Sequence, residues 1–202
     1  MTTPPFASIF AIRTAAAAFA IALAACGSPA PKERYFTLAA PGPGVAPASS
    51  QSPSVFVGPV SVPDAVDRSQ MVLRTGANQV DVSDDDRWAE PLRSAIPRVI
   101  AETLSRELGS SRVLASRMTA GTPVDYRVAI EVQRFDSSLD EGATIDALWT
   151  ISTPSGPSRN GRSTVHEPAA SHDPAGIAAA HAKALARIAG DIAQAIRSMG
   201  AR

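Results

Sequence analysis

The sequence predicts an α/β domain in which two long helices pack on a mixed, largely antiparallel sheet. Two stretches carry apolar residues three or four positions apart, which is typical of helices that bury one face. Several shorter stretches alternate apolar and polar residues, which is typical of half-buried strands. Both patterns start after a hydrophobic leader and a segment rich in Pro, Ser and Ala. We therefore expect one domain over residues 55–202, preceded by a signal peptide and a flexible tether.

The leader has the composition of a secretory signal. Arg13 is its one cationic residue, and residues 14–25 form a mostly apolar run that ends in small residues. A run of about a dozen residues is too short for a helix to cross the ~30 Å hydrocarbon core of a bilayer. Residues 1–25 are therefore interpreted as a cleavable signal peptide, and a permanent transmembrane anchor is the less favoured alternative.

The end of this leader, Leu23-Ala24-Ala25-Cys26, resembles the lipobox of bacterial lipoproteins. The resemblance implies cleavage between Ala25 and Cys26 and attachment of fatty acyl chains, palmitate among them, to Cys26. Cys26 is the only cysteine of the chain, so no disulfide accounts for it; a free thiol after ordinary signal cleavage is the alternative. One acyl chain binds a membrane only marginally, at ~0.8 kcal/mol per buried CH₂, whereas several chains hold a protein stably. Among lipoproteins, Gly27 in place of an aspartate implies sorting to the periplasmic face of the outer membrane.

Composition narrows the function classes of the mature chain. Removal of the signal leaves 18 basic and 19 acidic side chains, and no Lys/Arg cluster interrupts this balance. Such a chain has no long-range field that attracts nucleic acid. Residues 26–54 are dense in Pro, Ser, Gly and Ala and predict a lipidated flexible tether, in which the β-prone residues 35–38 are a candidate edge strand.

The first elements of the domain are predicted to be strands. Residues 55–60 form an apolar run closed by Pro63, and residues 70–75 and 79–83 flank a Gly-containing loop typical of a hairpin. Three aspartates follow at 84–86. They lack the spacing of a calcium-binding loop, so we interpret them as the N-cap of a helix that starts there.

That first helix is predicted from a steady apolar spacing. Gly109 supplies its C-terminal stop, and Pro97 inside the pattern predicts a kink or a break after Ile96. The apolar positions are Trp88, Leu92, Ile96, Val99, Ile100, Leu104 and Leu108.

The second half of the domain predicts a meander followed by a helix. Residues 126–133 and 144–151 alternate in the manner of strands, and Asn160-Gly161 is interpreted as a turn into a third strand at 163–167. Asp173 and Pro174 form the start signal of the last helix. Its buried stripe is predicted to be Ile177, His181, Leu185, Ile188, Ile192 and Ile196.

No catalytic constellation emerges from the sequence. Ser171-His172-Asp173 has the letters of a triad, but triad members meet through the fold and not as sequence neighbours. His166 shows no metal-ligand spacing, and His181 on an apolar helical face is typical of a packed core histidine. We expect a non-enzymatic protein with no metal and no cofactor; a hydrolase remains an alternative only if Ser, His and Asp side chains converge in space.

Beyond the lipobox, the chain resembles the ABC-type transport auxiliary lipoproteins, which include the Pqi-type lipoproteins. The segments that carry this resemblance keep their order and spacing over nearly the whole mature chain. They are residues 34–38, 57–63, 67–68 with 70–72 and Arg74, 86–92, 96–99, 125–128, 135–136 and the late alanine-rich helix.

The resemblance implies a subunit of an intermembrane lipid transport system. Its partners would be the membrane, through the lipid, and a periplasmic MCE-domain protein that works with a permease and an ATPase. A homo-oligomeric ring would suit a tubular partner. Arg68, Arg74 and Trp88 are candidate interface residues, although the position of Trp88 favours the core. The alternative function is an envelope assembly or structural lipoprotein that binds an outer-membrane protein or peptidoglycan.

One departure from the family pattern concerns the sheet. The strands at 126–133 and 144–151 each carry a fairly polar face. This polarity predicts either that helices do not cover both faces of the sheet or that a neighbouring subunit uses the open face.

Overall fold

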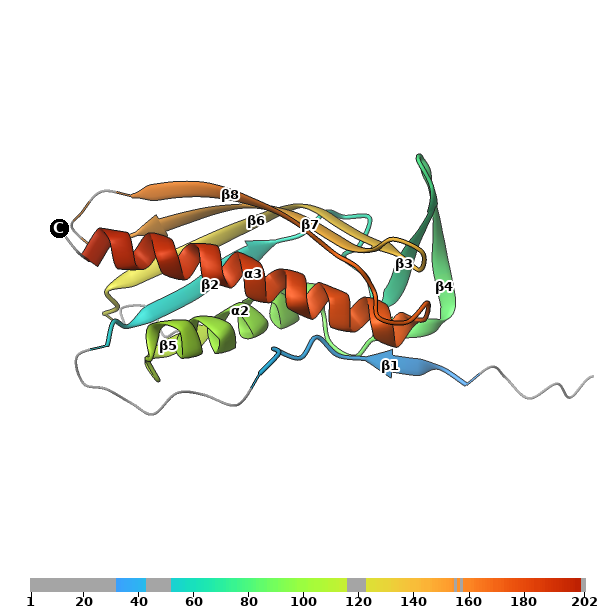
Figure 1. Ribbon diagram of the computed structural model, residues 1–202, viewed down its shortest axis with the longest axis horizontal. Helices are drawn as coiled ribbons and strands as arrows, with labels where there is room; N and C mark the ends of the chain where they lie inside the picture. Colours follow the sequence, from blue (N-terminus) through green and yellow to red (C-terminus); the bar gives the residue numbers. More distant parts are fainter. Residues whose placement is uncertain (1–31, 43–51, 116–122, 155, 157, 201–202) are drawn as a thin grey trace, which may run out of the picture. The chain divides into compact units, whose positions relative to one another are not determined.

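The computed structural model describes residues 32–42, 52–115, 123–154, 156 and 158–200 (Figure 1). Ala25 and Cys26, the predicted cleavage and lipidation site, lie outside these residues. In the part of the chain that the structure describes, no helix is long and apolar enough to cross a membrane. Residues from Glu33 onward form one compact unit.

This unit is built on a mixed sheet whose longest strand, β6, lies at its centre. Strand β6 pairs antiparallel with β7 on one side and parallel with β2 on the other. Strand β8 extends the sheet beyond β7, and β5 extends it beyond β2. The strands of this main sheet are β2 (Val55–Ser61), β5 (Val113–Ala115), β6 (Tyr126–Ser138), β7 (Gly142–Ser152) and β8 (Arg159–Glu167).

A hairpin projects from one end of this sheet. Its strands, β3 (Gln70–Gly76) and β4 (Gln79–Trp88), pair antiparallel with each other, and Leu73 pairs with Ser137 near the end of β6. A short strand, β1 (Arg34–Phe36), pairs in parallel with the last residues of β4. It lies at the edge of the sheet and overlaps residues 35–38, where an edge strand was expected.

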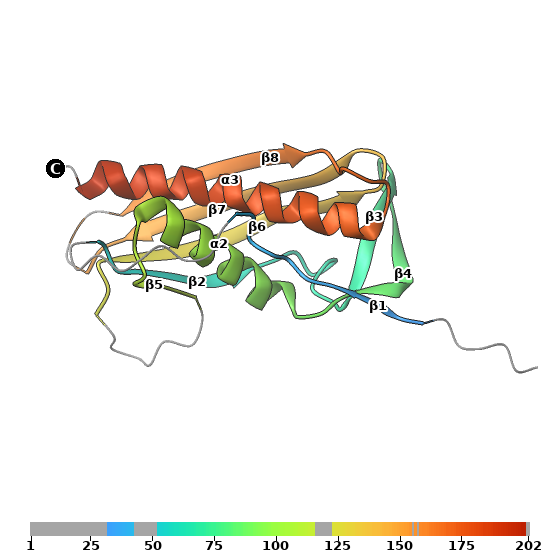
Figure 2. The same cartoon turned by 60° about the horizontal axis from the view of Figure 1, so that its bottom comes forward.

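Both helices lie on the same face of the sheet (Figures 1 and 2). Helix α2 (Leu92–Leu108) and helix α3 (Pro174–Gly200) pack against each other and against the apolar side chains of β6 and β7. The six residues of the predicted α3 stripe are all buried. The core therefore lies between one sheet face and two helices, and the predicted fold class is confirmed.

The opposite face of the sheet has no helix over it in the described part of the chain (Figures 1 and 2). Arg127, Glu131 and Gln133 of β6 are exposed on it, as is Leu148 of β7. The polar alternation of these strands therefore reflects helical cover on one face only.

Several local predictions are confirmed. The hairpin turns at Ala77 and Asn78, and Gly109 ends α2 in the left-handed conformation with φ 58°. At the start of α3 the Asp173 carboxylate accepts a hydrogen bond from the Gly176 N–H at 2.7 Å. His181 is fully buried and lies within hydrogen-bonding distance of the Ser137 hydroxyl.

The three aspartates at 84–86 do not cap a helix. They belong to β4, and α2 begins six residues after Asp86, with Pro91 at its N-cap and no side-chain cap. The strand continues because Asp86 is held by the Ser83 hydroxyl and by Arg34 of β1. Trp88 is accordingly a strand residue, although it is buried as expected.

A kink or a break was expected after Ile96, and the break does not occur. Helix α2 runs continuously through Pro97, because packing of its buried face offsets the one missing donor; Pro97 itself is buried. The turn predicted at Asn160-Gly161 was wrong. Asn160 and Gly161 do not form a turn but pair with Thr150 and Trp149 inside β8. Glycine is needed there because the Trp149 ring lies over it: a Cβ at Gly161 would lie 2.0 Å from Trp149 Cζ2.

Candidate functional site

The predicted interface residues divide between two places. Arg68 and Trp88 line the same hollow, with a volume of about 490 Å³, together with Tyr35. Arg74 instead lies on the projecting hairpin. The structure therefore brings two of the three candidates together.

Trp88 contributes to the core beneath this hollow. Its side chain is 6% exposed, and its ring meets the rings of Phe135 and His181 edge-on, with centroids 6.1 Å apart in each pair. Phe135 and His181 stack face to face at 3.8 Å. This cluster joins β4, β6 and α3, so the main contribution of Trp88 is to packing.

Arg74 fixes the hairpin to the sheet. Its guanidinium donates to both carboxylate oxygens of Asp136, at 3.0 Å each, and to the carbonyl oxygens of Gly76 and Ala77. The hydrogen bonds to Asp136 and the negative charge of its carboxylate raise the pKa of Arg74. Burial opposes ionisation of Asp136, but hydrogen bonds from Arg74 and Arg134 outweigh it and lower the pKa of Asp136. Held in this way, the guanidinium of Arg74 fixes the position of the hairpin relative to the sheet.

The segment just before the predicted domain is fastened to the body, and we call residues 33–42 the N-terminal clamp. Its strand β1 is fixed by two ion pairs, from Arg34 to Asp86 and from Arg87 to Glu33, each at 2.7 Å. Glu33 also accepts a hydrogen bond from Tyr35. This bond and, to a smaller extent, the one from Arg87 lower the pKa of Glu33.

Helix α2 holds the second half of the clamp. Leu38 is 1% exposed and belongs to the main core. Arg98 donates to the Leu38 carbonyl oxygen at 2.8 Å, and Arg106 donates to the Pro41 carbonyl oxygen at 2.7 Å. Part of the expected tether over residues 26–54 is therefore folded against the domain.

The sequence predicted a strand within the clamp but did not reveal the α2 side chains that hold the clamp. Arg98, Glu102 and Arg106 recur four positions apart along one side of α2, which signals a polar helix face. That spacing cannot show that the face receives the carbonyl groups of an earlier segment, because such contacts depend on the tertiary fold.

Tyr35 stands on the clamp between two hollows. The first is the hollow of Arg68 and Trp88. The second, of about 390 Å³, lies between clamp residues 36–41 and small residues of the first turns of α3, and Tyr35 lines it as well. Tyr35 is 60% exposed, so an amphipathic aromatic side chain marks this end of the body.

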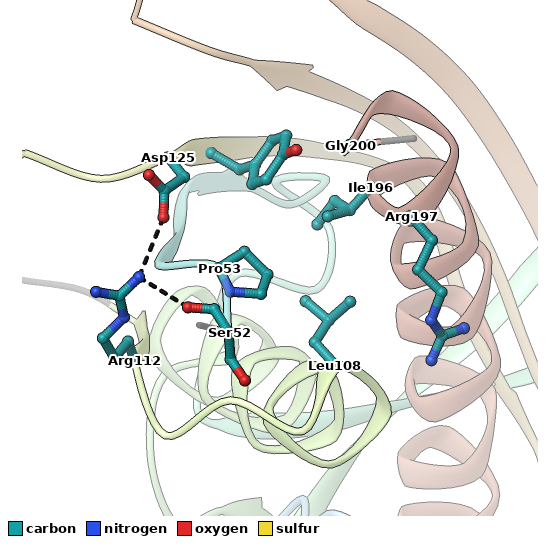
Figure 3. Close-up of a pocket in the computed structure, with 9 residues that line it drawn as sticks. Ser52, Pro53, Leu108, Arg112, Asp125, Ile196, Arg197 and Gly200 are labelled. Carbon is teal, nitrogen blue, oxygen red and sulfur yellow. Dashed lines mark hydrogen bonds and ion pairs between the residues drawn. The ribbon is translucent and has the colours of Figure 1, made fainter. Parts of the chain in front are cut away.

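A third hollow, of about 620 Å³, lies at the opposite end of the helices (Figure 3). Leu108 and Ile196 from the last turns of α2 and α3 line it, opposite Pro53. At its rim Arg112 bonds to the Ser52 carbonyl oxygen at 2.7 Å and to Asp125 at 3.3 Å. Hydrogen bonds from Ser54 lower the pKa of Asp125. We call this region the far end.

The histidine, serine and aspartate side chains considered for catalysis are dispersed among structural contacts. The Ser171 hydroxyl donates to the Asp173 carboxylate, while His172 donates to the Leu139 carbonyl oxygen, at 2.8 Å in each case. His166 bonds to Thr144 on the open sheet face. Among the described residues, no group of three or more His, Cys, Asp or Glu side chains is arranged to hold a metal ion.

Comparisons with known proteins give one family match and similar solved structures. A family model described as "ABC-type transport auxiliary lipoprotein component" matches residues 36–193, so the match begins inside the clamp. A comparison with curated protein sequences finds no match.

Two crystal structures resemble the fold over most of its length. One is of an uncharacterized protein, with a TM-score of 0.63 and 17% identity over 82% of this chain and 99% of that chain. The other is of a protein from Xanthomonas campestris described by the family name DUF330, with a TM-score of 0.60 and 20% identity over 79% of this chain and 92% of that chain. At these identities the likeness establishes the fold alone.

Proposed function

Because this chain belongs to the family of ABC-type transport auxiliary lipoprotein components, we propose that it is the membrane-anchored, non-enzymatic subunit of an intermembrane lipid transport system. In this role it docks a periplasmic MCE-domain protein, driven by a permease and an ATPase, to the outer membrane and so supports envelope integrity. The observation that carries the proposal is the family match over residues 36–193.

The amino terminus supplies independent support for anchoring. The lipobox at residues 23–26 predicts an acylated Cys26, and Gly27 favours the outer membrane. The proposed location is the periplasmic face of that membrane. A lipoprotein held there projects its folded body into the periplasm. A partner anchored in the inner membrane extends into the same space.

The body offers surfaces that suit a docking role. The open sheet face is polar and has no helix over it in the described residues, and the hairpin projects beyond the sheet. In the described part of the chain, β8 pairs only with β7, so its outer edge is available to a neighbouring copy. A ring of copies around a tubular partner would use such edges, and native mass spectrometry of the lipidated protein measures the copy number.

Affinity capture tests the proposed partner. The lipidated protein, extracted from membranes and captured through a C-terminal tag, should recover an MCE-domain protein. The same protein with Arg68→Ala should recover less of it if Arg68 contacts the partner, and this variant keeps Arg74, which holds the hairpin to the sheet. Recovery of an outer-membrane barrel or of peptidoglycan, without any MCE-domain protein, would instead establish the structural-lipoprotein alternative.

A further inference from the structure

The clamp shortens the distance over which the body can move from its lipid. Glu33, where the clamp begins, follows Cys26 by only seven residues. An extended chain advances ~3.3–3.6 Å per residue, so the clamp lies within about 25 Å of the lipidated residue. A tether that ran unattached to residue 54 would instead reach on the order of 100 Å.

The start of the clamp, strand β1, and the far end lie at opposite ends of α2, while the rest of the clamp runs along the helix from Arg98 to Arg106. The Ala89 N–H, three residues before α2 starts, donates to the Phe36 carbonyl oxygen of the clamp at 2.8 Å. Leu108, the last residue of the helix, lines the far-end hollow. A helix of 17 residues rises about 25 Å, so the short tether keeps the β1 end near the bilayer, whereas the far end is able to stand about 25 Å farther out.

The surface around the clamp has the chemistry of a membrane interface. Tyr35 is exposed, and tyrosine is enriched at the boundary between headgroups and hydrocarbon. The charges of the strand itself are matched, Arg34 with Asp86 and Arg87 with Glu33. Arg68 and Lys183 line the two hollows beside Tyr35 and add positive charge, so this surface suits zwitterionic headgroups and anionic headgroups alike.

We propose that the surface around the N-terminal clamp, with Tyr35 at its centre, faces and contacts the lipid membrane, and that the far end points away from it. This inference rests on the proposed lipidation of Cys26. Under it, the clamp orients the docking surfaces: the far-end hollow is presented to the periplasm, and the first hollow, with Arg68, lies close to the bilayer.

Distance-dependent fluorescence quenching tests this orientation. Because the only native thiol is acylated, an added cysteine is the single site for a fluorophore. The lipidated full-length variants Ala89→Cys, beside the clamp, and Ser111→Cys, at the far end, are reconstituted into phosphatidylcholine vesicles that carry a headgroup quencher. We expect quenching at position 89 to exceed quenching at position 111 several-fold, with a ratio at least as large in vesicles that contain anionic lipid.

Two controls separate orientation from anchoring. Flotation with the vesicles establishes that the protein is anchored, and a protein that does not float would overturn the lipid anchor and this inference with it. Insertion of about 20 Gly/Ser residues after Pro31 lengthens the tether and should bring the two quenching efficiencies together. A floating protein with equal quenching at both positions would overturn the orientation while leaving the transport role intact, whereas a ratio that the insertion does not change would show that contact with lipid alone maintains the orientation.

Discussion

At the scale of single residues, the approach of Trp149 to the backbone of Gly161 makes a stringent packing site. A Cβ at position 161 would lie 2.0 Å from Cζ2 and 2.2 Å from Cη2 of the indole, and the Trp149 Nε1 is held by the Ser163 hydroxyl at 3.1 Å. We predict that Gly161→Ala destabilises the protein by about 1–3 kcal/mol, because the ring must move away from its rotamer and its hydrogen bond. Urea unfolding monitored by tryptophan fluorescence measures the change.

Gly190 provides the matched control for this substitution. It lies in α3, and a Cβ there would meet no atom within 4 Å. Gly190→Ala should stabilise the protein by about 0.5–1 kcal/mol, because alanine loses less backbone entropy than glycine in a helix. If the two substitutions shifted stability equally, steric exclusion at Gly161 would be the wrong explanation.

His181 is the one buried ionisable side chain on the apolar face of α3. Its Nε2 lies 2.8 Å from the Ser137 hydroxyl, and among the described residues its Nδ1 has no hydrogen-bond partner. Burial lowers the pKa of His181 to about 3, and the nearby Asp136 carboxylate offsets only part of this effect. The side chain is therefore neutral in the folded protein at ordinary pH and packs as a polar aromatic ring.

This burial predicts a pH-dependent loss of stability. In the unfolded chain the pKa of histidine returns to ~6.5, so below that pH the unfolded state binds a proton that the folded state excludes until about pH 3. The contribution of His181 is full above pH 6.5 and falls as the pH is lowered, by about 2 kcal/mol between pH 7 and pH 5. His181→Gln keeps a partner for Ser137 but does not titrate. The free energy of unfolding of this variant should fall less over the same range, and equal slopes for the two proteins would contradict the assignment.

At the scale of elements, the N-terminal clamp depends on one buried side chain and a set of polar contacts along the chain. We predict that Leu38→Ala costs about 2–4 kcal/mol, because it leaves a cavity in the core beneath the clamp. Hydrogen exchange provides a local measurement: the Ala89 amide, bonded to the Phe36 carbonyl oxygen, should lose protection. Thr37→Ala alters an exposed neighbour and should leave that amide protected. Loss of protection in both variants would mean that the clamp is held by other contacts.

The helices and strands also show where local sequence patterns are sufficient to predict the structure. The α3 stripe, the hairpin and the Asp173 cap depend on local periodicity and capping chemistry, and these were predicted correctly. Asp84–Asp86 and Asn160-Gly161 carry the signals of a helix cap and a turn, but in each case a contact from another strand decides the conformation. Asp86 is engaged by Arg34, and Gly161 makes room for Trp149. Neither partner can be identified from local sequence.

The candidate site was only partly predictable for the same reason. Arg68 and Trp88 were named from the sequence and share one hollow, but Tyr35 and the arginines of α2 complete this end of the molecule. Residues 26–54 as a whole have a composition that predicts a tether, because Pro, Ser, Gly and Ala dominate outside the β-prone residues 35–38. Leu38, paired strand residues and carbonyl groups held by Arg98 and Arg106 nevertheless fix them to the body.

At the scale of the whole molecule, the proposed function separates folding from anchoring. The compact unit begins at Glu33, and the clamp contacts that the structure describes all involve residues after Cys26 in the chain. Under the proposed lipidation, the acyl chains would supply location and not stability, and the clamp would convert location into orientation. Substitution of the anchor and disruption of the clamp should consequently have different effects.

Cys26→Ala removes the proposed acceptor for the lipid. We predict that its free energy of unfolding equals that of the non-acylated parent protein within about 0.5 kcal/mol, because position 26 precedes the compact unit in the chain. Cell fractionation should find the variant released from the membrane, and lipid exchange between the two membranes should fall to the level of a strain that lacks the protein.

Ser28→Ala, two residues away, should keep both anchoring and transport. Leu38→Ala should remain in the membrane fraction while its orientation is lost. Transport that persisted in Cys26→Ala would show that the partner can hold the body in place without lipid, and anchoring would then be dispensable to the mechanism.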